Sequence, residues 1–323
     1  MTQRRDFLKT ALGASGLAVA GASAAQAAIY TGSATVYPDV TGLPGAGKNK
    51  FKLDYAPHIG MFENSAGKDP IDQLKFMADQ GFTAIEDNGM MGRDPALQEK
   101  MGAEMARLGL KMGVYVFETG NNWKVSFTTG KKEFVDNFMA TANKAIETSK
   151  RCGGKLATVV PGYFERNLPM GIQTGHVIDV LRRGADALAP HGITMVLEPL
   201  SDNPDLFMRT SDQTYALCRA VNSPSCKILF DIYHMQRNEG HIIPHIDWAW
   251  DEIGYFQIGD NPGRKEPTTG EINYKNIFKH IYDKAKASNR SFIFGMEHGN
   301  SLPGKDGEMA LIRAYVESDS FTV

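Results

Sequence analysis

Cysteine is scarce in this chain, with three residues among 323. An odd number of cysteines in a chain of this length does not predict a disulfide framework. Cys218 falls inside a helical pattern and Cys226 opens a strand-like run, which favours buried free thiols at both positions. A disulfide between Cys218 and Cys226 is the alternative that the sequence leaves open, and Cys152 falls at a helix end.

An excess of charge and a basic cluster are also absent. The 35 Lys and Arg residues are balanced by 37 Asp and Glu residues, for a formal net charge of −2. Nucleic-acid binding usually requires a basic patch, so we expect no nucleic acid among the partners. The sequence also lacks the Gly-rich first turn with which a doubly wound dinucleotide-binding sheet usually begins.

No apolar run near the N-terminus is long enough to span a bilayer. The run at residues 11–20 is short and rich in Gly and Ala, whereas a spanning helix needs about 20 apolar residues, so we expect no stable membrane anchor. This run follows Arg4-Arg5 and precedes Ala25-Gln26-Ala27, the layout of a secretory signal peptide of the twin-arginine type. We therefore predict a signal peptide at 1–27, an N-terminal extension at 28–50, and export to the periplasm by the twin-arginine machinery.

Strand-like and helix-like patterns alternate from residue 51 to the end of the chain. We predict strands at 52–62, 83–87, 111–118, 156–161, 194–199, 226–232, 253–259 and 291–297. Amphipathic helices are predicted at 72–78, 95–108, 133–149, 177–188, 212–221, 241–250, 276–287 and 308–317. Eight such units favour an α/β fold with a single (β/α)8 TIM barrel over residues 51–323.

Four of the predicted strands end in a side chain that can bind a metal ion: Glu198, Asp231, Gln257 and Glu297. The carboxyl ends of barrel strands meet on one rim, and burying unpaired carboxylates there is costly. A divalent cation removes that cost, and an all-oxygen ligand set suits Mg²⁺ or Mn²⁺. A single acidic residue at a strand end is more often a helix cap, but four on consecutive strands favour a metal site.

Three segments around these residues resemble the hydroxypyruvate isomerase family of xylose isomerase-like barrels. They are residues 196–200 (VLEPL), 230–236 (FDIYHMQ) and 255–274, which contains NPGR. The resemblance implies that Glu198 and Glu297 are acid/base groups and also metal ligands. It implies further that Asp231 and Gln257 are metal ligands and that His234 and Arg264 contact the substrate. The chain departs from the family pattern at Tyr255, where a histidine is usual, and at His298.

Two further residues are candidates for substrate binding. His58 lies in the end of the first predicted strand, where a substrate contact competes with a histidine satisfied within the core. Trp123 lies in the loop after the third strand, where covering the substrate competes with simple packing. His298 directly follows Glu297 and should point away from it, because adjacent strand residues face opposite sides.

We therefore expect a metal-dependent isomerase of hydroxypyruvate or a related small ketose or keto acid, working by proton transfer through an enediolate. The alternatives are a ketose 3-epimerase and a periplasmic sugar- or acid-binding protein without turnover. A multi-zinc endonuclease is disfavoured, because it would need more histidines and a basic face. A small-molecule substrate is the expected partner, and a homo-oligomer is compatible with the sequence.

Overall fold

The computed structural model describes residues 50–323. Its strands run parallel and are β1 (Asp54–Pro57), β2 (Ala84–Ile85), β3 (Lys111–Met112), β4 (Val114–Val116), β5 (Leu156–Val159), β6 (Thr194–Leu197), β7 (Cys226–Asp231), β8 (Ile253–Gln257) and β9 (Ile293–Met296). Seven of them form one sheet in the order β1-β9-β8-β7-β6-β5-β4, and β2 pairs with β3. The signal peptide predicted at 1–27 and the extension at 28–50, except Lys50, lie outside the described residues.

Strand β2 closes the sheet into a ring. On one side the Glu86 N–H donates to Pro57 O at 2.9 Å, and on the other the Gly113 N–H donates to Ile85 O at 2.7 Å. β3 and β4 follow one another on either side of Gly113, so they fill one place in the ring and the strands occupy eight places. The predicted (β/α)8 TIM barrel is therefore confirmed.

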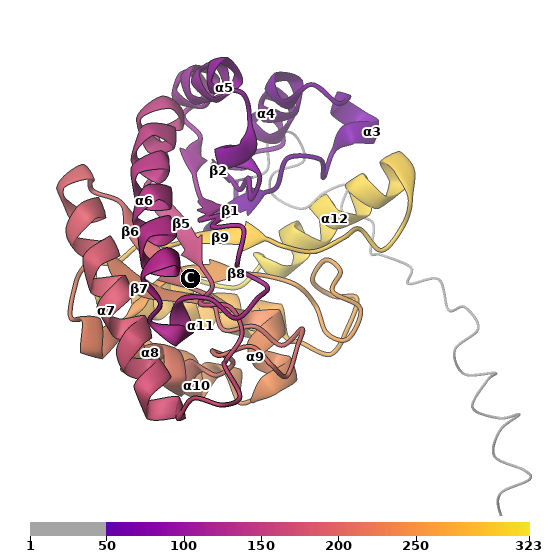
Figure 1. The fold of residues 1–323 in the computed structure, drawn as a ribbon. Helices are drawn as coiled ribbons and strands as arrows, with labels where there is room; N and C mark the ends of the chain where they lie inside the picture. The colour runs from indigo at the N-terminus through magenta and orange to yellow at the C-terminus, as the bar shows by residue number, and fades with distance from the viewer. Residues whose placement is uncertain (1–49) are drawn as a thin grey trace, which may run out of the picture. The chain divides into compact units, whose positions relative to one another are not determined.

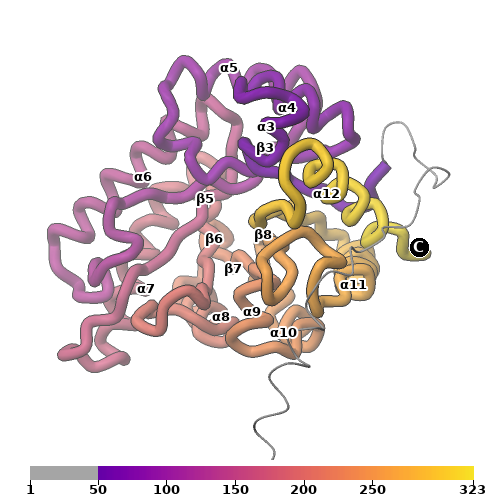
Figure 2. Tube along the Cα trace, turned by 90° about the vertical axis from the view of Figure 1, so that its right-hand side faces the viewer, coloured from indigo at the N-terminus to yellow at the C-terminus, as the bar shows by residue number. Residues whose placement is uncertain are grey.

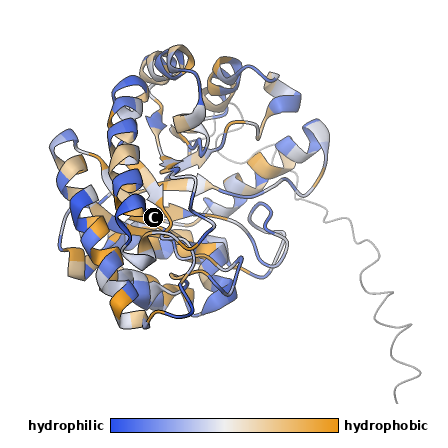
Figure 3. Cartoon of the chain, in the orientation of Figure 1, coloured by the Kyte–Doolittle hydropathy of each residue, from blue (hydrophilic) through white to orange (hydrophobic). Residues whose placement is uncertain are grey.

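Helices surround the ring of strands (Figures 1 and 2). They are α3 (Glu63–Ala66), α4 (Pro70–Asp79), α5 (Pro95–Leu108), α6 (Lys132–Cys152), α7 (Met170–Leu188), α8 (Ser211–Val221), α9 (Ile232–Asn238), α10 (Ile242–Ala249), α11 (Tyr274–Ala287) and α12 (Gly304–Ser318). Figure 3 shows apolar residues concentrated on the strands and on the helix faces that meet them. This pattern is expected, because each amphipathic helix packs its apolar face against the apolar strands and against the neighbouring helices.

Local sequence explains where several helices begin and end. Asp69 and Asp94 cap α4 and α5 by accepting hydrogen bonds from Ile71 and Ala96, and a proline follows each cap. Gly109 ends α5 in the left-handed conformation that glycine adopts at low cost. These signals account for the close agreement between the predicted and observed bounds of α5.

Several elements differ from the sequence prediction. α7 begins at Met170, seven residues before the predicted start, and the short helix α9 was not predicted. α9 forms because the Asp231 carboxylate accepts hydrogen bonds from the N–H groups of Tyr233 and His234, which caps the helix directly at the end of β7. The first strand is also shorter than predicted, because β1 ends at Pro57.

The three cysteines are buried free thiols, so no Cys218–Cys226 disulfide is present. Within residues 50–323, none of the helices combines the length and the apolar composition that crossing a membrane requires.

Asp319 ties the beginning of the barrel to its end. Its carboxylate accepts a 2.8 Å hydrogen bond from the Lys52 N–H and a 3.0 Å hydrogen bond from the buried Tyr55 hydroxyl. Burial raises the pKa of Asp319 to about 6, although its hydrogen-bond donors and Lys52 oppose the shift. The carboxylate therefore joins the strand that opens the barrel to the segment that follows α12.

We expect Asp319→Ala to lower the free energy of unfolding by roughly 1–3 kcal/mol, because it leaves the buried Tyr55 hydroxyl without its acceptor. Asp306→Ala is the control, since Asp306 is exposed in the first turn of α12, and it should cost less than about 1 kcal/mol. Urea unfolding of both variants measures the difference. Equal stabilities for the two variants would contradict the structural role of Asp319.

Candidate active site

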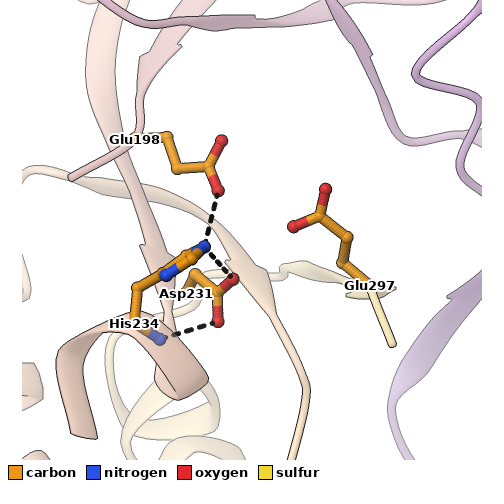
Figure 4. Close-up of side chains that lie close together, drawn as sticks. All are labelled: Glu198, Asp231, His234 and Glu297. Atoms are coloured by element: carbon orange, nitrogen blue, oxygen red, sulfur yellow. Dashed lines mark hydrogen bonds and ion pairs between the residues drawn. The ribbon is translucent and has the colours of Figure 1, made fainter. Parts of the chain in front are cut away.

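The side chains predicted to bind a metal lie together at the carboxyl ends of four neighbouring strands. Glu198 directly follows β6, Asp231 ends β7, Gln257 ends β8, and Glu297 directly follows β9. Ligand atoms of Glu198, Asp231, Glu297 and of His234, in the first turn of α9, all lie within 4.8 Å of one another. Figure 4 shows Glu198 and Asp231 beside the His234 ring, and the Glu297 carboxylate turned toward these three from across the site.

Three buried oxygens of this group have no hydrogen-bond partner among the described residues. They are Oε1 of Glu198, Oδ2 of Asp231 and Oε1 of Gln257. Asp231 and Gln257 each use their other polar atom elsewhere, in the α9 cap and in a bond to Glu86. Buried polar atoms are normally satisfied, and three unpaired oxygens in one place match the donor set of a hard divalent cation. The residues therefore fit a metal ion.

His234 presents one ring nitrogen to the carboxylates. Its Nδ1 lies 3.2 Å from the Ser201 backbone N and 2.8 Å from the Ser201 hydroxyl. The Ser201 backbone N–H and the Arg264 guanidinium can only donate, and Arg264 Nη2 lies 3.2 Å from Nε2, so both ring nitrogens of His234 face donors. Burial and then the positive charge of Arg264 lower the pKa of His234 to about 4, so the ring is neutral at pH 7.

Arg264 supplies the positive charge of the site. Its Nη2 lies 2.7 Å from Oε2 of Glu297 and 3.6 Å from Oδ2 of Asp231, and its guanidinium stacks on the Tyr233 ring at 5.0 Å. Burial lowers the pKa of Arg264, but the neighbouring carboxylates, Glu297 first, raise it further, so the net shift is upward. Arg264 therefore stays charged and directly neutralises part of the acidic cluster.

The loop that carries Arg264 is built around Asp260. The Asp260 carboxylate accepts hydrogen bonds from the N–H groups of Asn261, Gly270 and Ile272, and its backbone oxygen accepts from the Arg264 N–H. Arg264 itself has φ +49°, in the left-handed region that non-glycine residues seldom adopt. The dense bonding of Asp260 holds this costly conformation and fixes the direction of the arginine side chain.

Burial dominates the protonation of the two predicted acid/base groups. It raises the pKa of Glu198 well above the usual range, and repulsion from Glu297 and Asp231 adds to the shift. Burial also raises the pKa of Glu297, where Arg264 opposes it. Carboxyl groups whose pKa values are moved toward neutrality are suited to exchanging protons with a substrate.

A cavity of about 280 Å³ opens above these groups. Glu198, His234, Arg264 and Glu297 line it, and Trp123 lies at its wall with half of its surface exposed. His58 is not among the lining residues. Its ring nitrogens lie 3.1 Å from Ile59 O and 3.4 Å from His298 O, so the structure places His58 in backbone contacts beside the site.

His298 points away from the cavity, as the sequence predicted. It is buried, and its Nε2 lies 2.8 Å from the Tyr315 hydroxyl on α12. This residue therefore joins β9 to the last helix.

The sequence reasoning overlooked polar residues at the end of β2. Asn88 donates from Nδ2 to Oε1 of Glu297 at 2.9 Å, and the fully buried Glu86 contacts Gln257. The run Ala84-Ile85-Glu86-Asp87-Asn88 changes from apolar to polar as the four selected strands do. The change from apolar to polar residues at a strand end therefore also indicates Glu86.

A closed parallel barrel that gathers carboxylates at the carboxyl ends of its strands defines the class of this protein. A sequence profile of the Xylose isomerase-like TIM barrel family matches residues 74–315, most of the chain. The chain therefore belongs to the xylose isomerase-like TIM barrel family.

Individual relatives refine this placement. The chain is 35% identical to hydroxypyruvate isomerase of Escherichia coli over 158 residues, which cover 47% of this chain and 58% of that relative. It is 29% identical to 2-oxo-tetronate isomerase of Pectobacterium atrosepticum over 218 residues, which cover 65% and 80% of the two chains. The chain thus spans less than two thirds of the length of the Escherichia coli relative. These matches confirm the resemblance to hydroxypyruvate isomerases seen in the motifs.

Solved structures agree on the fold. The 3-keto-D-glucoside 4-epimerase of Escherichia coli superposes with a TM-score of 0.68 and 18% identity, covering 84% of this chain and all of the other. At this identity the likeness shows a shared fold.

Asp231 should make stability in the metal-free protein depend on pH. Its pKa is raised to about 6, mainly by burial, so the folded state binds a proton that an unfolded aspartate, with a pKa of about 4, has already released. Stability from this group is therefore present at low pH and is lost as the pH rises from about 4 through about 6.

We expect the unfolding free energy of Asp231→Asn, relative to the unchanged protein, to rise by on the order of 1–3 kcal/mol between pH 4 and pH 7.5, with chelator present. Asparagine also caps helices, so α9 keeps its cap. Urea unfolding at several pH values measures the change, and Asp94→Asn, at the exposed cap of α5, shows how much comes from capping alone. A constant difference at all pH values would contradict the prediction.

Proposed function

We propose that this chain is a divalent-metal-dependent isomerase of hydroxypyruvate or a related small ketose or keto acid. The observation that carries the proposal is the set of three buried oxygens of Glu198, Asp231 and Gln257 that have no hydrogen-bond partner among the described residues, at a cavity lined by Glu198 and Glu297. The two curated relatives described above carry the names of isomerases acting on hydroxypyruvate and 2-oxo-tetronate, which supports the reaction class.

The ion would be held by Glu198, Asp231, Gln257 and Glu297, with Mg²⁺ or Mn²⁺ as the candidates. When bound, it polarises the carbonyl of the substrate and stabilises negative charge that develops on neighbouring oxygens. Buried oxygens without a hydrogen-bond partner within residues 50–323, at the ends of three different strands, support this ligand set.

The proton transfers belong to Glu198 and Glu297. One carboxylate removes the proton from the carbon beside the carbonyl, which leaves an enediolate, and a carboxyl group then returns a proton to the neighbouring carbon. Arg264 and His234 line the same cavity, and the Arg264 guanidinium can donate hydrogen bonds to substrate oxygens. Such donors stabilise the charge that builds up during the reaction.

A ketose 3-epimerase is the second candidate, and the charge of the cavity wall favours it. Glu118 and Asp202 line the cavity, and Arg264, the single Arg or Lys in the lining, already bonds to Glu297. A keto acid would add another negative charge to this wall, whereas a neutral ketose would not. The Oγ1 of Thr158 and Oδ1 of Asn88, also in the lining, have no partner among the described residues and suit sugar hydroxyls.

The test is proton NMR in D₂O with Mg²⁺ or Mn²⁺, hydroxypyruvate and a panel of neutral ketoses and aldoses. We expect chelator-sensitive loss of a carbon-bound proton signal, and at least about 100-fold slower exchange in both Glu198→Gln and Glu297→Gln, because each removes an acid/base group. Glu63→Gln on the exposed surface of α3 is the control and should exchange normally.

The outcomes separate the candidates. Exchange with hydroxypyruvate and formation of its aldehyde isomer supports the isomerase, while exchange at carbon 3 of a neutral ketose supports the epimerase. Normal exchange in either glutamine variant would exclude the two-glutamate mechanism. Absence of exchange throughout the panel, with metal bound, would favour a periplasmic binding protein.

We propose further that residues 1–27 direct export to the periplasm by the twin-arginine route. The support is Arg4-Arg5, the short apolar run and the Ala25-Gln26-Ala27 site. Replacing both arginines by lysine in the full chain should leave the uncleaved protein in the cytoplasm. Cell fractionation measures this, and an unchanged amount of cleaved protein in the periplasm would exclude the route.

A further inference from the structure

A buried carboxylate lies directly beneath the candidate metal ligands. Glu86, which follows β2, has no exposed surface and does not line the cavity. Its Oε1 accepts a 3.0 Å hydrogen bond from Nε2 of Gln257, and its Oε2 accepts a 2.9 Å hydrogen bond from the Tyr255 hydroxyl. Because both oxygens accept from protein donors inside the barrel, Glu86 is poorly placed to exchange a proton with a substrate.

The barrel makes room for this group at two glycines. A β-carbon at Gly295 on β9 would collide with Oε2 of Glu86, and one at Gly113 would collide with the Tyr255 hydroxyl and Ile85 O. Tyr255 and Gln257 stand two residues apart on β8, so their side chains share the inward side of the strand. Three strands and two glycines therefore fit together around one polar cluster of Tyr255, Glu86 and Gln257.

The cluster determines which end of the Gln257 amide faces the site. The two ends of an amide are nearly equal in shape, but one donates and the other accepts. Burial and repulsion from Glu297 raise the pKa of Glu86 well above its usual range. In its charged form the Glu86 carboxylate can only accept, so it binds the NH₂ end. The buried Oε1 of Gln257 is left without a hydrogen-bond partner among the described residues. It lies at the same end of the barrel as Oε1 of Glu198 and Oδ2 of Asp231.

We propose that Glu86, oriented by Tyr255, is a positioning residue that turns the oxygen of Gln257 toward the metal site. This inference rests on the metal site of the proposed function. Without the Glu86 carboxylate, the amide could present its NH₂ group to a cation, which would remove one ligand and repel the ion.

The decisive variant is Glu86→Gln, which keeps the size of the side chain. The Tyr255 oxygen already takes a hydrogen bond from the Val114 backbone, which favours donation by its hydroxyl hydrogen. The oxygen of the new glutamine then pairs with this hydroxyl, and the new NH₂ group meets the NH₂ group of Gln257. This conflict favours rotation of Gln257. We expect Mn²⁺ affinity, measured by calorimetry, to fall by about 10- to 100-fold, as when groups that orient metal ligands are lost.

Exchanging the two functional groups should restore binding. In Glu86→Gln/Gln257→Glu, the NH₂ group at position 86 donates to the carboxylate at 257, whose second oxygen faces the site. The net charge is unchanged, and we expect Mn²⁺ affinity to recover to within about 10-fold of the unchanged protein. Tyr255→Phe added to Glu86→Gln should recover part of the affinity, because the glutamine can then turn its oxygen to Gln257.

A second measurement needs no metal. In metal-free protein, the side-chain amide signals of Gln257, assigned by their absence in Gln257→Glu, should show protection from solvent exchange that is lost in Glu86→Gln. Thermal melting verifies that each variant is folded. Unchanged Gln257 signals in Glu86→Gln, unchanged Mn²⁺ affinity in that variant, or a folded double variant that binds no better than the single one would each overturn the inference.

Failure of the proposed function gives a different result. If the Gln257 signals and Mn²⁺ affinities change as expected but no substrate exchanges a proton, the positioning role of Glu86 stands and the isomerase assignment falls.

Discussion

The main physical constraint on this structure is the unfavourable electrostatic free energy of holding several carboxylates close together in a mostly buried site. Glu198, Asp231 and Glu297 meet within a few ångströms at one end of the barrel, where charge is expensive to bury. Arg264 and Asn88 bond to Glu297, and the backbone of α9 bonds to Asp231. These contacts offset part of the cost, and three oxygens remain unpaired among the described residues. The same grouping is unfavourable without a cation, and a divalent cation would stabilise it.

The barrel provides this grouping through topology. Parallel strands deliver the residues after their last buried position to one rim, however far apart these residues lie in the sequence. Glu86 and Glu297 are separated by most of the barrel sequence, yet both reach the site from strands close to β1. The fold-level likeness to an epimerase at 18% identity shows that this scaffold persists while sequences diverge. The loops add Trp123, Glu118 and Asp202 to the lining of the cavity.

The polar residues of the site form two layers. The upper layer, Glu198, His234, Arg264 and Glu297, lines the cavity and carries the groups suited to proton transfer and substrate contact. The lower layer of Tyr255 and Glu86 is fully buried and contacts the upper layer through Gln257. A ligand is only as well placed as the residues that orient it, so the choice of residues beneath the site matters as much as the choice of ligands.

Much of this protein could be predicted from its sequence. The alternation of strand and helix patterns predicted the barrel, and the change from apolar to polar residues at strand ends predicted the grouping of Glu198, Asp231, Gln257 and Glu297, because both follow from local periodicity and one topological rule. The sequence could not decide the place of His58, the partner of Arg264, or the contact between Glu86 and Gln257. Those features depend on distances between segments far apart in the chain, and only the closed tertiary structure fixes which side chain each polar atom meets.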